Sequence, residues 1–322
     1  MGVREWGAKL PTPKKKNHTL PFKGRVGWGQ SQLMNPSPSS ETFRGRLALI
    51  TGASSGIGEA AALRLAREGL RLILVARRKE RLEAVATRVR EAGGQAHVLA
   101  ADLTNEADRA GMLAAAHELG PLDLLINNAG FGWYGYGSRM PVALAREMLA
   151  LNVGAAVDLS LNILRQMVAR GRGHIINISS IAGSLPNQGI AMYAGTKSFL
   201  DSFTTALHRE LRGTRVYASL VKPGPVRTEF FDAGAGEGTG QRIPAERFAI
   251  SAEQVAERIW GLVRRPRRVI YIPRVLTLSQ WVEPAVGWLI DFLGPLLLRR
   301  QPAYERVQEL APQSSRRTQR HP

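Results

Sequence analysis

Cysteine is absent from the sequence. The chain therefore has no disulfide bridge, no thiolate metal ligand and no cysteine nucleophile, which agrees with a reducing compartment such as the cytoplasm. Histidine is scarce too, and the six histidines show no spacing typical of zinc ligands, so we expect no metal site. The ordinary shares of hydrophobic residues, 44%, and charged residues, 22%, exclude a wholly disordered or fibrous chain.

Acidic residues are few compared with basic ones, 26 against 44, which gives a formal net charge of +18. Most of the excess lies at the two ends, within residues 1–33 and 264–322. Basic ends are either solvated tails or segments attracted to anionic lipid or nucleic acid. Because these tails lack the interleaved aromatic side chains of nucleic-acid-binding segments, we expect no nucleic-acid partner.

The N-terminus lacks the continuous apolar run that a secretory signal requires. Residues 1–43 instead combine a lysine run with scattered prolines and glycines, and we interpret them as a basic, disordered extension. Met34 offers an alternative translation start, in which case residues 1–33 would not be translated. A transit peptide is the other alternative.

From residue 46 to residue 272, short apolar runs alternate with segments of helical periodicity. This alternation predicts an α/β fold, a doubly wound parallel sheet of about seven strands of the Rossmann type, in a single domain over residues 44–272. The expected strands are 47–50, 72–75, 96–100, 122–126, 173–179, 215–221 and 269–272. The expected helices are 57–68, 79–92, 105–119, 143–170, 191–211 and 251–263.

A glycine-rich loop joins the first strand to the first helix and reads T-G-A-S-S-G-I-G from Thr51 to Gly58. Glycines at this place permit a tight turn, close approach of the backbone to phosphate and close packing of helix on strand. The N-terminus of the following helix offers free N–H groups to a pyrophosphate. The loop therefore predicts a dinucleotide site.

The spacing T-G-x-x-x-G-x-G resembles the short-chain dehydrogenase/reductase family, in its single-domain branch, rather than the G-x-G-x-x-G pattern. Further motifs of that family follow in its order along residues 44–272. They are N-N-A-G at 127–130, Asn152, Ser180, Y-x-x-x-K at Tyr193 and Lys197, and P-G at 223–224 with Thr228.

The resemblance implies a set of cofactor-binding residues. Asp102 is expected at the adenine, Asn128 near the ribose and Thr228 near the carboxamide. The full expected set is Gly52, Ser54, Ser55, Gly56, Ile57, Gly58, Arg77, Arg78, Asp102, Leu103, Asn128, Ala129, Gly130, Tyr193, Lys197, Pro223, Gly224, Val226 and Thr228.

The end of the second strand indicates which dinucleotide is bound. NAD enzymes usually place a carboxylate there to hold the ribose 2′-hydroxyl, but this chain has Ala76 followed by Arg77 and Arg78. A guanidinium matches the geometry of a 2′-phosphate, so we expect NADP(H). Some NADP enzymes of the family carry a basic residue just before the second glycine, where this chain has Ser55.

The catalytic residues expected from the resemblance are Asn152, Ser180, Tyr193 and Lys197. Tyr193 would be the general acid in reduction and the general base in oxidation. Lys197 lies four residues later on the same helix face, and its ammonium is expected to lower the tyrosine pKa and to hold the nicotinamide ribose. Ser180 would bond the substrate oxygen, and Asn152 would position a water that links Lys197 to solvent.

Three segments are candidates for substrate specificity. The aromatic stretch 131–136 would either line an apolar pocket or simply pack. The glycine-rich region 230–250 is expected to be a mobile lid, with a passive linker as the alternative. Leu185 and Pro186, between Ser180 and Tyr193, are further candidates for substrate contact.

Residues 273–322 form an unusual C-terminal extension with a basic tail. Its apolar stretch is interrupted at Glu283, Pro284, Asp291 and Pro295, which argues against a membrane-spanning helix. Tryptophans beside arginines suit an amphipathic segment, here 275–300, that lies in a membrane interface. The alternative is that this segment packs over the domain or a dimer partner.

These observations predict an NADP(H)-dependent oxidoreductase that interconverts a ketone and a secondary alcohol, with a lipophilic or acyl-chain substrate favoured. The alternatives are a general 3-oxoacyl or small-ketone reductase and a dinucleotide-binding sensor or interaction protein without turnover. The two long helices 143–170 and 191–211 are usual assembly surfaces of the family, so a homodimer or homotetramer is expected. The expected location is the cytoplasm, with contact at the inner face of a membrane as an addition.

Overall fold

The computed structural model describes residues 43–230 and 249–282, together with 285, 287–289 and 292. The predicted N-terminal extension, most of the predicted lid and the basic C-terminal tail lie outside the described residues. The domain boundaries near residues 44 and 272 therefore stay predictions.

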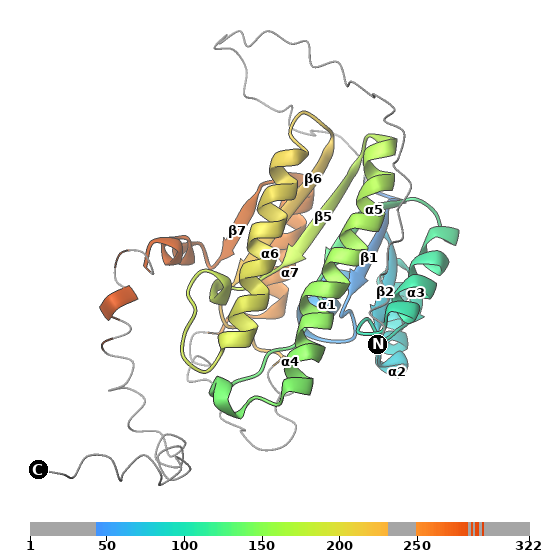
Figure 1. Cartoon of the computed structure of the whole chain (residues 1–322). Coiled ribbons are helices and arrows are strands. Elements are labelled where there is room, and N and C mark those ends of the chain that lie inside the picture. Colours follow the sequence, from blue (N-terminus) through green and yellow to red (C-terminus); the bar gives the residue numbers. More distant parts are fainter. Residues whose placement is uncertain (1–42, 231–248, 283–284, 286, 290–291, 293–322) are drawn as a thin grey trace, which may run out of the picture. The chain divides into compact units, whose positions relative to one another are not determined.

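The centre of the fold is a parallel sheet of seven strands in the order β3-β2-β1-β4-β5-β6-β7 (Figure 1). Chain order reverses between β1 and β4, which confirms the doubly wound prediction. All six pairings are parallel, and Ile50 in the central strand stands between Leu74 and Ile126 of its neighbours. The strands are β1 (Leu47–Thr51), β2 (Arg71–Ala76), β3 (Gln95–Ala100), β4 (Leu122–Asn127), β5 (Gly173–Ile178), β6 (Val216–Pro223) and β7 (Val269–Ile272).

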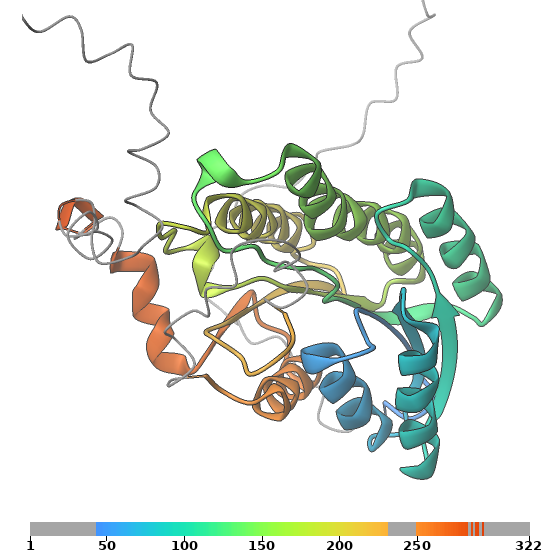
Figure 2. The ribbon, with the colours of Figure 1, turned by 90° about the horizontal axis from the view of Figure 1, so that it is seen from below.

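Helices cover both faces of the sheet, as Figure 2 shows. Helices α1, α2 and α7 lie on one face, and α3, α4, α5 and α6 lie on the other. Their bounds are α1 (Gly56–Ala66), α2 (Lys79–Glu91), α3 (Glu106–Glu118), α4 (Val142–Leu149), α5 (Ala156–Arg170), α6 (Ala191–Glu210) and α7 (Ala252–Arg264). Because a strand alternates its side chains between faces, Ala48 and Ile50 join one core while Leu47 and Leu49 join the other.

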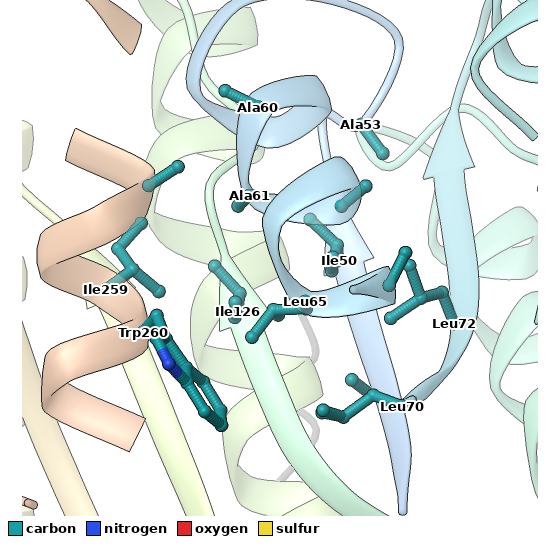
Figure 3. Close-up of a cluster of buried hydrophobic side chains, with 14 of the residues drawn as sticks. Ile50, Ala53, Ala60, Ala61, Leu65, Leu70, Leu72, Ile126, Ile259 and Trp260 are labelled. Atoms are coloured by element: carbon teal, nitrogen blue, oxygen red, sulfur yellow. The ribbon is translucent and has the colours of Figure 1, made fainter. Parts of the chain in front are cut away.

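Small side chains bring α1 close to the sheet and to α7 (Figure 3). Ala61 and Ala62 are fully buried, and the larger Leu65, Ile259 and Trp260 fill the space between the two helices. Close contact of α1 with the sheet fixes the N-terminus of this helix at the end of β1. The fold thus holds the glycine loop in one place.

The long helix expected at 143–170 is interrupted in its hydrogen-bonding pattern. Helices α4 and α5 are continuous, but residues Ala150–Ala155 (η2) form a π-helical turn that contains Asn152. The turn contains one residue more than an α-helical turn, and the Asn152 side chain points into the protein. This residue is 1% exposed. By length and composition Val142–Arg170 qualifies as a membrane span, but 44% of its most apolar window is buried, as suits a helix covering a sheet.

Candidate active site

The predicted motifs gather at one edge of the sheet, where the parallel strands end. The glycine loop follows β1, N-N-A-G follows β4, Ser180 follows β5 and the P-G motif ends β6. This edge includes the point where the strand order reverses, which is where ligands bind in open parallel sheets. The structure therefore brings together motifs that the sequence spreads over more than 170 residues.

The glycine loop is held against the N-N-A-G segment by a set of hydrogen bonds. The Asn128 side chain donates to the carbonyls of Thr51 and Gly52 at 3.0 and 3.2 Å. The Thr51 hydroxyl accepts from the backbone N–H groups of Asn128 and Ala129, both at 2.9 Å. Gly52 has φ +63°, a left-handed conformation that glycine adopts without strain.

The N-terminus of α1 is open to an anion. Its N-cap residue, Ser55, makes no side-chain cap, and the helix begins at Gly56 with φ +57°. A Cβ at Gly56 would lie 2.9 Å from Cγ2 of Thr228, so the P-G segment lies directly beside this turn. Free N–H groups, a positive helix end and the absence of side-chain bulk make a cradle that fits a pyrophosphate.

The two arginines after β2 occupy different places. The Arg78 guanidinium donates to the hydroxyls of Ser54 and Ser55 at 3.2 and 3.1 Å, so it lies on the glycine loop. Arg78 also pairs with Glu229 at 3.3 Å. Arg77 instead points to Glu147 at 3.5 Å. Arg78 is therefore the arginine placed to meet a phosphate bound at this loop.

Asp102 and Leu103 follow β3 at the same edge. Burial raises the pKa of Asp102, but hydrogen bonds from the backbone N–H and hydroxyl of Thr104, together with the charge of Arg77, leave the pKa below its usual value. The Leu103 side chain is 3% exposed and belongs to a core. The adenine contact predicted for Asp102 remains a prediction.

Tyr193 and Lys197 lie on the first turns of α6, facing Ser180 at the end of β5. Tyr193 is hydrogen-bonded to the Ser180 side chain. The Lys197 ammonium donates to the Ile178 carbonyl at 2.9 Å and lies 5.7 Å from the centre of the Tyr193 ring. Tyr193 and Lys197 are 7% and 3% exposed, so this cluster is shielded from water.

Asn152 completes the predicted set from the π-helical turn. Its side chain accepts from the Phe131 N–H and donates to the Phe131 carbonyl, both at 3.0 Å, and donates to the Thr196 hydroxyl at 3.1 Å. A Cβ at Gly130 would lie 2.8 Å from the Asn152 oxygen and 3.8 Å from the Lys197 ammonium. The glycine thus leaves open the space between the amide and the ammonium. The water predicted there stays a prediction.

The net shift of the Tyr193 pKa is opposite to the predicted lowering, and Lys197 is not among its causes. Burial raises the pKa of Tyr193 to about 12. The hydrogen bond with Ser180 opposes this rise, and the charge of Asp201 adds to it. Burial likewise lowers the pKa of Lys197 to about 8, which Asp201 opposes. Burial is the largest cause of both shifts. The positive charge of an oxidised nicotinamide is the remaining contribution expected to lower the tyrosine pKa.

Apolar side chains surround Tyr193. Phe131 and Trp133 from the predicted aromatic stretch are 5% and 8% exposed and pack with Tyr193 in one cluster. Phe230 packs edge-on against the Tyr193 ring, with centroids 5.4 Å apart. Phe131 and Trp133 are therefore core residues of the site wall, and Phe230 is a contact that sequence reasoning assigned only to a lid.

The P-G motif is held by the C-terminal segment. Gly224 donates its N–H to the Ile272 carbonyl at 2.8 Å, and a Cβ at Gly224 would lie 2.8 Å from Leu276. Leu276 belongs to the short helix η6 (Arg274–Leu278), which follows β7. Val226 pairs with Ile250 in an isolated bridge.

Sequence reasoning missed Asp201 and Lys222, a buried ion pair beside Ser180, because neither belongs to a recognised motif.

The family model for short chain dehydrogenases matches residues 46–236. The chain belongs to this family. An uncharacterized oxidoreductase of Myxococcus xanthus is 40% identical over 186 residues, 57% of this chain and 73% of that protein. A fatty acyl-CoA reductase of Acinetobacter baylyi is 32% identical over 265 residues, 79% of this chain and 85% of the relative.

Solved structures agree with this membership. The short-chain dehydrogenase from Sphingobium yanoikuyae, in complex with NADPH, superposes with a TM-score of 0.67 at 32% identity. The similarity covers 76% of this chain and 95% of that one. The family resemblance inferred from the motifs is thereby confirmed, and so is the fold.

Proposed function

We propose that this short-chain dehydrogenase is an NADP(H)-dependent oxidoreductase that interconverts a ketone and a secondary alcohol. The observation that carries the proposal is the shielded cluster of Ser180, Tyr193 and Lys197 beside the open N-terminus of α1. NADP(H), when bound, supplies or accepts the hydride. The protein's task is then to hold the substrate oxygen and to move one proton.

We assign each step to a residue of this cluster. The Ser180 hydroxyl bonds the substrate oxygen, and its bond to Tyr193 aligns the phenol with the same oxygen. In reduction the Tyr193 hydroxyl donates its proton to the developing alkoxide of the substrate. In oxidation the Tyr193 phenolate removes the proton from the substrate hydroxyl. The Lys197 ammonium is held by the Ile178 carbonyl and would bind the ribose hydroxyls of the cofactor, and Asn152 faces it across Gly130.

NADP(H) is the proposed cofactor because Arg78 lies on the glycine loop and no carboxylate ends β2. Three features of the site fit NADP(H). The N-terminus of α1 has no side-chain cap, the loop has glycines where a Cβ would collide with neighbouring residues, and the Arg78 guanidinium lies beside the loop. The Sphingobium relative, solved with NADPH, supports the same choice.

Arg78→Ala is expected to weaken NADPH binding about 10- to 100-fold and to leave NADH binding unchanged. The reason is the loss of a charged hydrogen bond to the 2′-phosphate, worth roughly 1.5–3 kcal/mol. Titration of cofactor fluorescence measures both dissociation constants. Arg88→Ala is the matched control, since Arg88 is an exposed, ion-paired arginine farther along α2. An equal loss for NADH and NADPH would contradict the role.

The proposed substrate is lipophilic or carries an acyl chain. Apolar side chains lie around Tyr193, and the similarity to the Acinetobacter fatty acyl-CoA reductase points the same way. The runner-up is a general 3-oxoacyl or small-ketone reductase, for which chain length would not matter. The non-enzyme alternative, a dinucleotide sensor, predicts cofactor binding without turnover.

The C-terminal segment supports a location at a membrane surface. Beyond β7 the described side chains include exposed large apolar groups, at Val275, Leu278, Trp281, Trp288 and Phe292. Tryptophans with neighbouring basic residues suit the headgroup region of an anionic bilayer. We therefore propose a cytoplasmic protein that contacts the inner face of a membrane through residues 275–300.

A homodimer or homotetramer is the proposed assembly. The long helices that the family uses for assembly expose apolar side chains on their outer faces. Leu161 and Val168 of α5 are 38% and 48% exposed, and Phe199 of α6 is 45% exposed and stacks on Phe203. Such groups gain from burial against a second copy.

The proposed function is tested by following NADPH oxidation by the full chain with simple and β-keto ketones of increasing chain length. Tyr193→Phe supplies the blank. We expect a Tyr193-dependent rate that rises with chain length, together with sedimentation of the protein with anionic vesicles. A rate independent of chain length would support the runner-up, and NADPH binding with no turnover on any ketone would support the sensor.

A further inference from the structure

Lys222 and Asp201 form a buried ion pair that the proposed reaction does not use. Lys222 is near the end of β6, and Asp201 is on α6, one turn beyond Lys197. The Lys222 ammonium donates to the Asp201 carboxylate and to the Ser184 hydroxyl. The two side chains are 4% and 17% exposed. A buried ion pair is weak evidence for stability, because desolvation of the two charges offsets their attraction.

The pair bonds both flanks of the turn that begins with Ser180. On one side, the Ser179 hydroxyl donates to the Asp201 carboxylate at 2.6 Å. On the other side, Ser184 accepts from Lys222. Between these flanks lie Ser180 and the short helix η3 (Ile181–Gly183).

The turn also lies directly on α6. A Cβ at Gly183 would come within 2.6 Å of the Asp201 carboxylate and 2.9 Å of the Lys197 carbonyl carbon, so only glycine allows this approach. The Gly183 carbonyl accepts from the Ser198 hydroxyl at 2.8 Å. The turn carrying Ser180 and the helix carrying Tyr193 and Lys197 are thereby joined at the ion pair.

The described charged and titratable groups around the pair come from three elements. Helix α6 contributes Lys197 and Tyr193, β6 contributes Lys222, and Tyr271 of β7 lies with its ring centre 5.5 Å from the Lys222 ammonium. Burial raises the pKa of Asp201, and Lys222 opposes that shift. The Asp201 charge in turn raises the pKa of both Tyr193 and Lys197.

We propose that Asp201 and Lys222 are positioning residues that fix the Ser180 turn against α6 and so set the alignment of Ser180 with Tyr193. The inference rests on the proposed function, since it assigns the pair to the same reaction. Both residues act through their contacts with Ser179, Ser184 and Gly183, and Asp201 acts also through its charge on Tyr193. Neither residue belongs to the expected substrate or cofactor contacts. A displacement of about 1 Å at such a site is enough to reduce turnover about 100-fold.

Three variants of the full chain test the proposal: Asp201→Asn, Lys222→Met and the double variant. The double variant leaves no unpaired charge and keeps the fold measurable by circular dichroism. We expect kcat to fall about 10- to 100-fold in all three, while KM for NADPH stays within about twofold, because the cofactor contacts are untouched. Asp158→Asn is the matched control: Asp158 pairs with Arg109 between α3 and α5, away from the turn, and kcat should not change.

The pH profile of alcohol oxidation separates positioning from a purely structural role. Loss of the Asp201 charge lowers the pKa of Tyr193, so the rising limb of the Asp201→Asn profile should move to lower pH. Wild-type kcat and an unmoved profile in the folded double variant would overturn the proposal. Absence of Tyr193-dependent turnover in the wild type would instead mean that the proposed function itself has failed.

Discussion

Tyr193→Phe is expected to lower kcat for ketone reduction about 10²- to 10⁴-fold, the range that general acid catalysis contributes. The substitution removes only the hydroxyl that bonds Ser180 and leaves the ring packed against Phe230. NADPH affinity and the melting temperature should therefore stay close to the wild type. Steady-state kinetics, with fluorescence titration of NADPH as the control, measure the effect.

The raised pKa of Tyr193 sets the sign of the pH dependence. With a pKa of about 12, the Tyr193 hydroxyl is protonated at neutral pH. Ketone reduction therefore needs no acidic pH to keep the proton donor protonated. Oxidation needs the phenolate, so its rate should rise with pH and the rise should begin below pH 12, because the bound oxidised nicotinamide lowers the pKa. A Tyr193→Phe variant within tenfold of the wild type, or oxidation that falls as pH rises from 6 to 9, would contradict this role.

Gly58→Ala is expected to destabilise the fold by about 1–3 kcal/mol and to raise the Kd for NADPH more than tenfold. The added Cβ would lie 2.8 Å from the Gly52 carbonyl carbon and 2.7 Å from the Asn128 side-chain nitrogen. Both neighbours belong to the hydrogen-bonded contact between the glycine loop and N-N-A-G, and neither moves without breaking it. Urea denaturation and NADPH titration measure the two effects.

Gly111→Ala supplies the matched control for this prediction. Gly111 is also inside a helix, α3, but a Cβ there meets nothing within 4 Å. The same substitution should stabilise the protein by about 0.5–1 kcal/mol, since alanine is the better helix former. If both variants lost stability equally, the loss at Gly58 would not come from the contact with Gly52.

Much of the fold was predictable because its determinants are local. Buried parallel strands read as short apolar runs, as at 72–75, and a helix with clear periodicity follows each of the first six. The predicted strands lie within about two residues of the observed ones. The site positions were predictable as well, since parallel topology carries every motif that follows a strand to the same edge.

Other features depend on contacts between distant residues, and sequence patterns do not contain them. The π-helical turn at Asn152 is stabilised by bonds to Phe131 and Thr196, which lie on other segments. The spacing of Lys197 from Tyr193 predicts a lowered tyrosine pKa, but the depth of burial, which no spacing shows, raises it. Asp201 and Lys222 are 21 residues apart, and no spacing rule pairs them.

The parallel direction of the strands also gives the domain two unlike ends. One end carries the site, and the other end tolerates added residues. The edge opposite the site carries the turns that enter the strands, and several end in glycines with positive φ, among them Gly69, Gly93, Gly171 and Gly213. These turns contribute nothing to the chemistry proposed above. Insertions, affinity tags or new chain termini belong at this edge, where added residues meet solvent and leave catalysis intact.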